Sequence, residues 1–135
     1  MSNDLEILIG KTILEINTSE GLNDIQFVTS DGDKFHFQCY GACCANAFIS
    51  TLENTSNLIG QEITEVLAED NSFEKSTNYV IDCVFYTIKS MKGRCFIDFR
   101  VEHNGYYGGD LRLILAPYDK KYNIEPIWES AKDTD

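Results

Sequence analysis

Three of the chain's five cysteines fall within six residues, in the stretch Cys39-Tyr40-Gly41-Ala42-Cys43-Cys44. Thiolates bind soft or borderline metal ions, and Zn²⁺ prefers four nitrogen or sulfur ligands in a tetrahedron. The glycine allows the backbone to turn, so that one loop can present three ligands. The spacing therefore predicts a zinc site with Cys39, Cys43 and Cys44 as ligands.

The fourth zinc ligand has to come from elsewhere in the chain. His36 is close in sequence but is expected on the opposite face of the strand from Cys39, whereas His103 is the candidate we retain. Cys83, a carboxylate or water are further possibilities. A closed set of four ligands is structural, and the chain lacks the H-E-x-x-H and H-x-E with P-C-x-x-C patterns of zinc hydrolases and deaminases. We therefore expect a structural zinc and no enzymatic activity.

Other interpretations of the cysteine cluster stay open at this point. Cys39 and Cys44 could be small buried core residues, because free cysteine is often buried. Cys43 and Cys44 could form a strained vicinal disulfide, or one of them could be a reactive thiol in the first turn of a helix. A reactive thiol needs a base, and neither His36 nor His103 is its neighbour in sequence.

Length and composition predict one soluble globular domain over residues 1–135. The chain is 43% hydrophobic, contains no apolar run long enough to span a membrane, and begins without a basic signal-like segment. An odd number of cysteines is unusual for a secreted disulfide framework. We therefore expect a cytoplasmic protein, with no membrane association.

The net charge of −11 indicates which partners to expect. An acidic surface repels nucleic-acid phosphates and anionic membranes, and it favours proteins with basic surfaces. Direct binding to nucleic acid is therefore not expected. The predicted contact residues are Tyr106 and Tyr107, in a glycine-rich connection, with the nearby acidic residues Glu102 and Asp110.

Alternating apolar and polar residues predict strands over Thr12–Asn17, Asp24–Thr29 and Lys34–Cys39. The last two should form a hairpin, because Asp31-Gly32 supplies the positive φ of a tight turn. From Cys43 to about Glu53, apolar residues recur at i, i+4 and i+8, which predicts a short amphipathic helix that begins at the Cys-Cys pair.

A sequence motif occurs twice and suggests two similar halves. Leu8–Ile16 and Leu58–Val66 share the pattern L-I-G-x-x-I-x-E-(I/V), and each copy leads toward a hairpin. The second hairpin is expected to turn at Met91-Lys92-Gly93, and the polar segment Ala68–Asn78 is expected to be a loop. The predicted fold class is α+β: a mostly antiparallel, twisted β-sheet made of two β-meander halves, with one short helix. A tail over about residues 129–135 is expected to be loosely docked or disordered.

These motifs resemble a family of small, uncharacterised proteins encoded by bacteriophages and prophages. The matching pieces cover most of the chain: Leu8–Ile13, Cys39–Cys44, Leu58–Ile63, Phe85-Tyr86 and Asn104–Tyr107. In that family the position of Cys39 is often histidine, and this exchange supports a zinc ligand over a core residue. The residue after the two cysteines is frequently acidic in the family, whereas Ala45 stands here.

The resemblance implies a function in a bacterial host cell. Small acidic phage proteins include inhibitors of bacterial defence, and some of these anti-CRISPR proteins bind the RNA-guided DNA endonuclease of type II systems and block DNA loading or mimic DNA. We expect such an inhibitor, stabilised by zinc. The alternatives are a small metal- or thiol-dependent enzyme and a structural or assembly protein of the phage.

Overall fold

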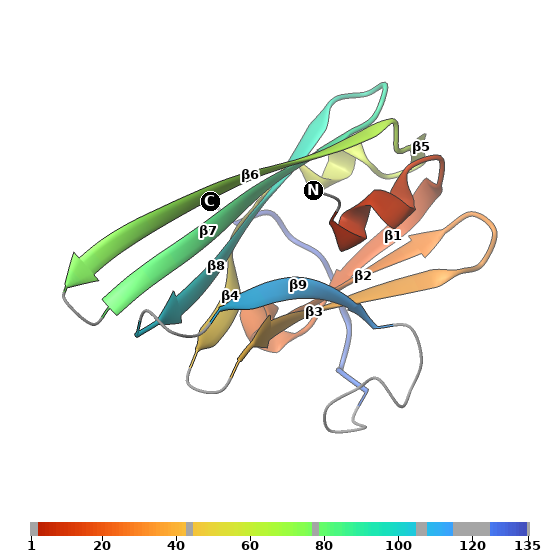
Figure 1. The fold of residues 1–135 in the computed structure, drawn as a ribbon. Helices are drawn as coiled ribbons and strands as arrows, with labels where there is room; N and C mark the ends of the chain where they lie inside the picture. The colour runs from red at the N-terminus through yellow and green to blue at the C-terminus, as the bar shows by residue number, and fades with distance from the viewer. Residues whose placement is uncertain (1–2, 43–44, 77–78, 105–107, 115–124, 135) are drawn as a thin grey trace.

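The chain folds into two antiparallel β-sheets that pack against each other (Figure 1). The computed structural model describes residues 3–42, 45–76, 79–104, 108–114 and 125–134. Short 3₁₀ helices are η1 (Asp4–Leu8), η2 (Glu20–Leu22) and η3 (Thr55–Asn57). The strands are β1 (Thr12–Thr18), β2 (Asp24–Thr29), β3 (Lys34–Gly41), β4 (Asn46–Glu53), β5 (Gln61–Glu62), β6 (Glu65–Ser76), β7 (Tyr79–Lys89), β8 (Arg94–His103), β9 (Gly109–Ile114) and β10 (Glu129–Ser130).

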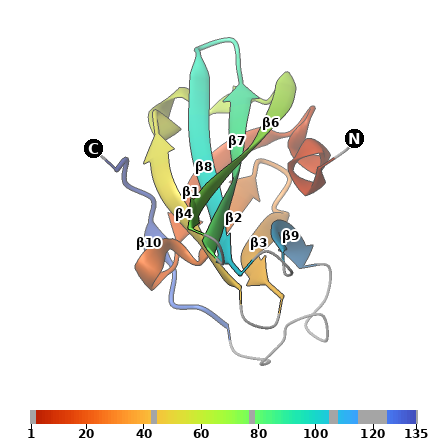
Figure 2. The same ribbon diagram turned by 60° about the vertical axis from the view of Figure 1, so that its left-hand side comes forward.

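The two sheets are built by an exchange of strands between the two halves of the chain. The first half forms the meander β1-β2-β3, and its next strand, β4, crosses to pair with β8. The second half forms the meander β6-β7-β8, and its next strand, β9, crosses back to pair with β3. The resulting orders are β10-β1-β2-β3-β9, with β5 also beside β1, and β4-β8-β7-β6 (Figures 1 and 2).

The repeated L-I-G motif forms the same tight turn in both halves. The Lys11 N–H donates to the Leu8 carbonyl at 2.9 Å, and the Gln61 N–H donates to the Leu58 carbonyl at 3.0 Å. Gly10 has φ +86° and Gly60 has φ +76°, which is the conformation that a type II turn requires at its third residue. The glycines of the motif are therefore explained by backbone geometry.

The two turns also bind each other. The Gly10 N–H donates to the Ile63 carbonyl at 2.8 Å, and the Gly60 N–H donates to the Ile13 carbonyl at 2.6 Å. Ile13 and Ile63 are fully buried, as are the leucines that open the two motifs. The repeat thus joins the halves through reciprocal hydrogen bonds and shared core residues.

The core lies between the sheets and draws on both halves. Phe27, Phe37 and Phe99 are its largest fully buried side chains, and the rings of Phe27 and Phe37 meet edge to face with centroids 5.8 Å apart. The prediction of a mostly antiparallel β protein is confirmed. The two meanders form two sheets.

The predicted helix from Cys43 to about Glu53 is wrong over its described part, because Asn46–Glu53 is strand β4. A spacing of four residues fits one face of a strand as well as one face of a helix. The residues that β4 buries are Ala47, Ile49 and Leu52, with a β-bulge between Ile49 and Thr51 that shifts the alternation. Because the bulge shifts the alternation of buried and exposed residues, the sequence of this segment does not show the two-residue period of a strand.

The predicted loop over Ala68–Asn78 is also wrong for most of its length. Strand β6 continues to Ser76 and pairs with β7, for example Glu69 with Phe85. The segment is polar because β6 is exposed from Leu67 to Phe73, and pairing with β7 supplies the backbone hydrogen bonds on one side of the strand.

The C-terminal segment crosses both sheets, where the sequence predicted a loose tail. The Ala131 N–H donates to the Ile16 carbonyl at 2.8 Å, and the Thr134 N–H donates to the Leu52 carbonyl at 2.7 Å. The Asp133 carboxylate accepts the Asn54 N–H on one oxygen and the Thr55 N–H on the other, each at 3.0 Å, at the start of η3. Burial opposes ionisation of Asp133, but the hydrogen bonds from Thr55 outweigh it and lower its pKa.

The turn geometry predicts a cost for any side chain at the two motif glycines. We expect Gly10→Ala and Gly60→Ala each to lower the free energy of unfolding by about 1–2 kcal/mol, because alanine is strained at positive φ. Gly108→Ala is the matched control, since Gly108 has no positive φ and open space around it. Urea denaturation measures the effect, and equal stability of all three variants would contradict the turn assignment.

Candidate functional site

Cys39, the first predicted zinc ligand, is a half-buried thiol on β3 that packs against the core. It lies opposite Leu111 of β9, and its thiol donates to the Leu22 carbonyl, 3.8 Å from the sulfur. Burial and, to a smaller extent, the nearby Asp24 carboxylate raise the pKa of Cys39 to about 12. The group is therefore protonated at neutral pH, and a bound metal would have to displace this proton.

The other predicted ligands are not assembled around Cys39 in the described part of the chain. Cys43 and Cys44 lie outside the described residues. His103 ends strand β8 in the other sheet, where its Nε2 lies 2.7 Å from Oδ2 of Asp82. Among the described residues, no group of three or more His, Cys, Asp or Glu side chains is placed to hold a metal ion.

The remaining cysteines are part of the packed sheet β4-β8-β7-β6. Cys83 on β7 and Cys95 on β8 are buried free thiols. Burial raises the pKa of both, to about 12 for Cys95. With β4 a strand, no helix dipole is available after Cys44 to stabilise a thiolate.

Two of the predicted contact residues are described. Tyr106 and Tyr107 lie outside the described residues. Glu102, on β8, is half-buried, and its hydrogen bond with Tyr79 raises the pKa of that phenol. Asp110, on β9, is exposed, and its Oδ1 lies 3.3 Å from Nε of Arg112.

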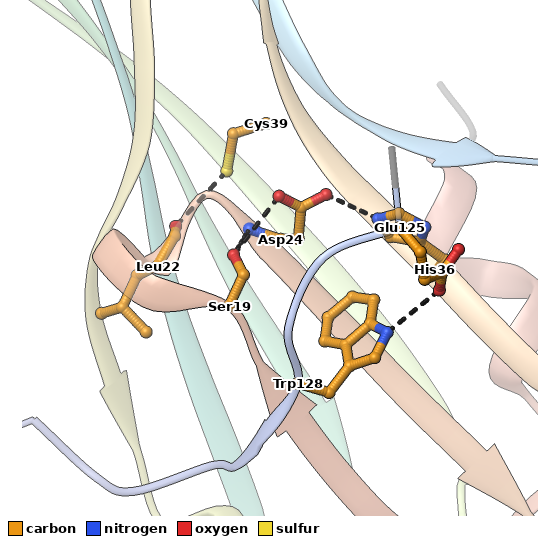
Figure 3. A network of polar contacts seen from close by, with 7 residues as sticks. All are labelled: Ser19, Leu22, Asp24, His36, Cys39, Glu125 and Trp128. Atoms are coloured by element: carbon orange, nitrogen blue, oxygen red, sulfur yellow. Dashed lines mark hydrogen bonds and ion pairs between the residues drawn. The ribbon is translucent and has the colours of Figure 1, made fainter. Parts of the chain in front are cut away.

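A buried cluster of interacting polar side chains lies around His36, and the sequence did not reveal it. His36 on β3 and Asp24 on β2 are diagonal neighbours across the first hairpin, and the imidazole Nε2 lies 2.5 Å from Oδ2 of Asp24 (Figure 3). Both side chains are 10% exposed. The Ser19 hydroxyl donates to the other oxygen of Asp24 at 3.3 Å and accepts the Asp24 backbone N–H at 2.9 Å.

The C-terminal segment covers this cluster. The Trp128 ring meets the His36 ring edge to face with centroids 4.9 Å apart, and the Trp128 indole N–H donates to Glu125 at 3.1 Å (Figure 3). The hairpin turn at Asp31-Gly32 could have suggested the His36–Asp24 pair. Trp128 is about ninety residues away and carries no comparable signal.

The geometry of this cluster fits a structural role. In a nucleophilic relay the hydroxyl hydrogen-bonds to the imidazole, and the carboxylate orients the imidazole from the far side. Here the Ser19 hydroxyl contacts the Asp24 carboxylate, and Trp128 lies over His36. The arrangement holds the η2 loop, the first hairpin and the C-terminal segment together.

Comparison with known protein families gives one match. A family model described as a domain of unknown function, DUF7448, matches residues 6–113. The chain belongs to the DUF7448 family. Comparisons with curated proteins and with solved structures gave no match.

The DUF7448 match includes both halves of the strand exchange, from η1 to β9. All four predicted zinc ligands and all four predicted contact residues fall inside it, whereas Trp128 falls outside. The exchanged-strand body is therefore the part of this chain that the family model describes. Within the described residues, no helix is long and apolar enough to cross a membrane.

The buried pair predicts a large effect of removing one partner. We expect Asp24→Ala to lower the free energy of unfolding by about 3 kcal/mol, because it removes the carboxylate that pairs with the buried His36 imidazole and accepts from the Ser19 hydroxyl. Asp110→Ala is the matched control: it also removes an aspartate of an ion pair, but an exposed one, and should cost less than about 1 kcal/mol. Denaturant unfolding compares them, and equal losses would argue against a structural role of the cluster.

The zinc hypothesis predicts a metal content that can be measured. A zinc site at Cys39, Cys43 and Cys44 should give about one metal ion per purified chain, and Cys43→Ser should abolish it. Cys95→Ser, a cysteine in the other sheet, should retain the metal. Metal analysis by inductively coupled plasma measures the zinc content of the wild type and of both variants. A metal-free wild type whose Cys39 resists alkylation at neutral pH would identify Cys39 as a core thiol.

Proposed function

We propose that this member of the DUF7448 family acts by binding another protein and is not an enzyme. The observation that carries the proposal is the acid excess, a net charge of −11 on 135 residues. Such a charge raises the rate of encounter with basic surfaces. The aspartates and glutamates of the chain supply charge that is complementary to a basic surface over a wide area.

The chemistry of the described side chains supports a binding role. Each of the two histidines has a carboxylate partner, Asp24 for His36 and Asp82 for His103. The cysteines Cys39 and Cys95 have pKa values raised to about 12 by burial, so neither is a ready nucleophile. These groups stabilise the fold and leave the surface to make contacts.

The proposed partner is the RNA-guided DNA endonuclease of a type II CRISPR system in a bacterial host. Its nucleic-acid channel is strongly basic, and an acidic protein that occupies the channel would block DNA loading. The resemblance to phage proteins and the sign of the charge support this choice. The proposed structural zinc would fix the connection between β3 and β4, near Cys39.

Binding to the nuclease tests this function. We expect the protein to bind the nuclease without DNA and to be displaced by target DNA. The affinity should fall about tenfold or more between 0.1 and 0.5 M salt, because exposed charges are screened. Biolayer interferometry with apo and guide-loaded nuclease measures both effects. Undetectable binding, or an affinity that does not change with salt, would contradict the proposal.

A further inference from the structure

Strand β6 forms an open edge of the sheet β4-β8-β7-β6 (Figure 1). Within the described residues it pairs only with β7, in unbroken register from Glu65 to Glu74. Side chains from Leu67 to Phe73 are exposed on both faces of the strand. The outer side of β6 therefore presents a long row of unpaired backbone N–H and C=O groups.

The other sheet edges are short or covered, so β6 differs from them. In the first half, β1 is the counterpart of β6, and the C-terminal segment covers it as β10 and through Ala131. At the edge strand β9, the Leu113 N–H donates to Asp4 at 2.8 Å. At the edge strand β4, the Leu52 N–H donates to the Thr134 hydroxyl at 2.8 Å. Only β6 keeps an edge of this length without such cover in the described part of the chain.

The side chains along this edge combine apolar contact area with free negative charge. Leu67 is 46% and Phe73 48% exposed, and Phe85 on β7, stacked on Phe96 at 5.6 Å, is 40% exposed. Phe73 and Phe85 line a shallow hollow of about 270 Å³.

Glu69 and Asp70 provide the free charge. Neither carboxylate has an ion-pair partner among the described residues, whereas Glu65 nearby is held by Lys89 at 2.8 Å. Within the described residues, the negative charge in the middle of β6 is therefore not neutralised by a basic side chain.

This charge decides which occupant fits. A second copy of the chain, pairing antiparallel about the middle of β6, would bring Glu69 and Asp70 of both copies together, and like charges across a strand pair are destabilising. An extended segment with lysine or arginine would pair its cations with these carboxylates and its backbone with β6.

We propose that β6 is the docking strand, at which a partner protein adds an extended lysine- or arginine-bearing segment as a further β-strand. The inference rests on the proposed binding function and adds the location and the mode of contact. Backbone hydrogen bonds along β6 give affinity, and Glu69 and Asp70 select a basic segment.

A defined peptide tests this docking mode without requiring the nuclease. The probe is a ten-residue peptide in which pairs of lysines alternate with pairs of valines, so that its extended form carries lysine on both faces. It is added to the full chain while amide hydrogen exchange is followed by nuclear magnetic resonance. Binding as a strand should slow exchange at every other amide between Leu67 and Phe73, because only alternate N–H groups point to the open side. Protection elsewhere and not on β6, or no protection, would overturn the proposal.

Charge reversal with a matched control tests the selection. Glu69→Lys with Asp70→Lys should weaken peptide binding about tenfold or more, since two attractions become repulsions. Glu20→Lys with Glu129→Lys changes the net charge equally at exposed sites away from β6 and should leave most of the affinity. Equal loss in both variants would overturn the proposal, and equal urea midpoints confirm that the variants fold.

Binding to the nuclease, measured beside binding to the peptide, distinguishes the proposed partner from the proposed docking strand. If the wild type does not bind the nuclease but the peptide protects β6, the proposed partner is wrong and the docking strand stands. If the nuclease binds and the β6 variant binds it as tightly as the control variant does, the function stands and the docking strand is wrong.

Discussion

The exchange of β4 and β9 between the two halves is the constraint on which the rest of the structure depends. Each sheet combines a three-stranded meander from one half with a crossing strand from the other half. Strand β9 joins the first meander and β4 joins the second, so neither sheet is complete from one half alone. The pairing of Cys39 with Leu111 joins residues more than seventy positions apart. The reciprocal hydrogen bonds of the two L-I-G turns also join the two halves, between Gly10 and Ile63 and between Gly60 and Ile13. Core, edges and polar clusters all take their positions from this arrangement.

The same arrangement explains why the chemistry-bearing residues are mostly internal. Strand β3 is paired on both sides, by β2 and by β9, and Cys39 on it packs against the core, where its thiol stays protonated. The outer face of β2 and β3 carries His36 and Asp24, and the C-terminal segment with Trp128 covers them. A buried carboxylate and imidazole are tolerated there because each satisfies the other. Histidines and cysteines of the described chain thereby contribute to the packed interior, and exposed acids and the edge of β6 remain on the surface.

Much of the β architecture could be predicted from local pattern. The strands before and after Asp31-Gly32 and the turn at Met91-Lys92-Gly93 follow from alternation and turn residues, and the structure has both hairpins. The errors occurred where pairing with a distant strand decided the outcome. β4 was mistaken for a helix because of its bulge, and β6 was mistaken for a loop because its exposed residues are polar. Of the candidate site, the position of Cys39 on the apolar face of β3 and the proximity of His36 to Asp24 across the hairpin could be predicted locally.

The sequence by itself determined the charge and the two hairpins, because each depends on residue type or on neighbours within a few positions. It also showed the repeated L-I-G motif, and the structure then explained its glycines by the positive φ of two type II turns. Tertiary structure alone decided which sheet β4 and β9 join, which edges the C-terminal segment covers, and that Trp128 lies over His36. These outcomes depend on contacts between segments far apart in the chain, whose free energy is gained only when both sheets form together.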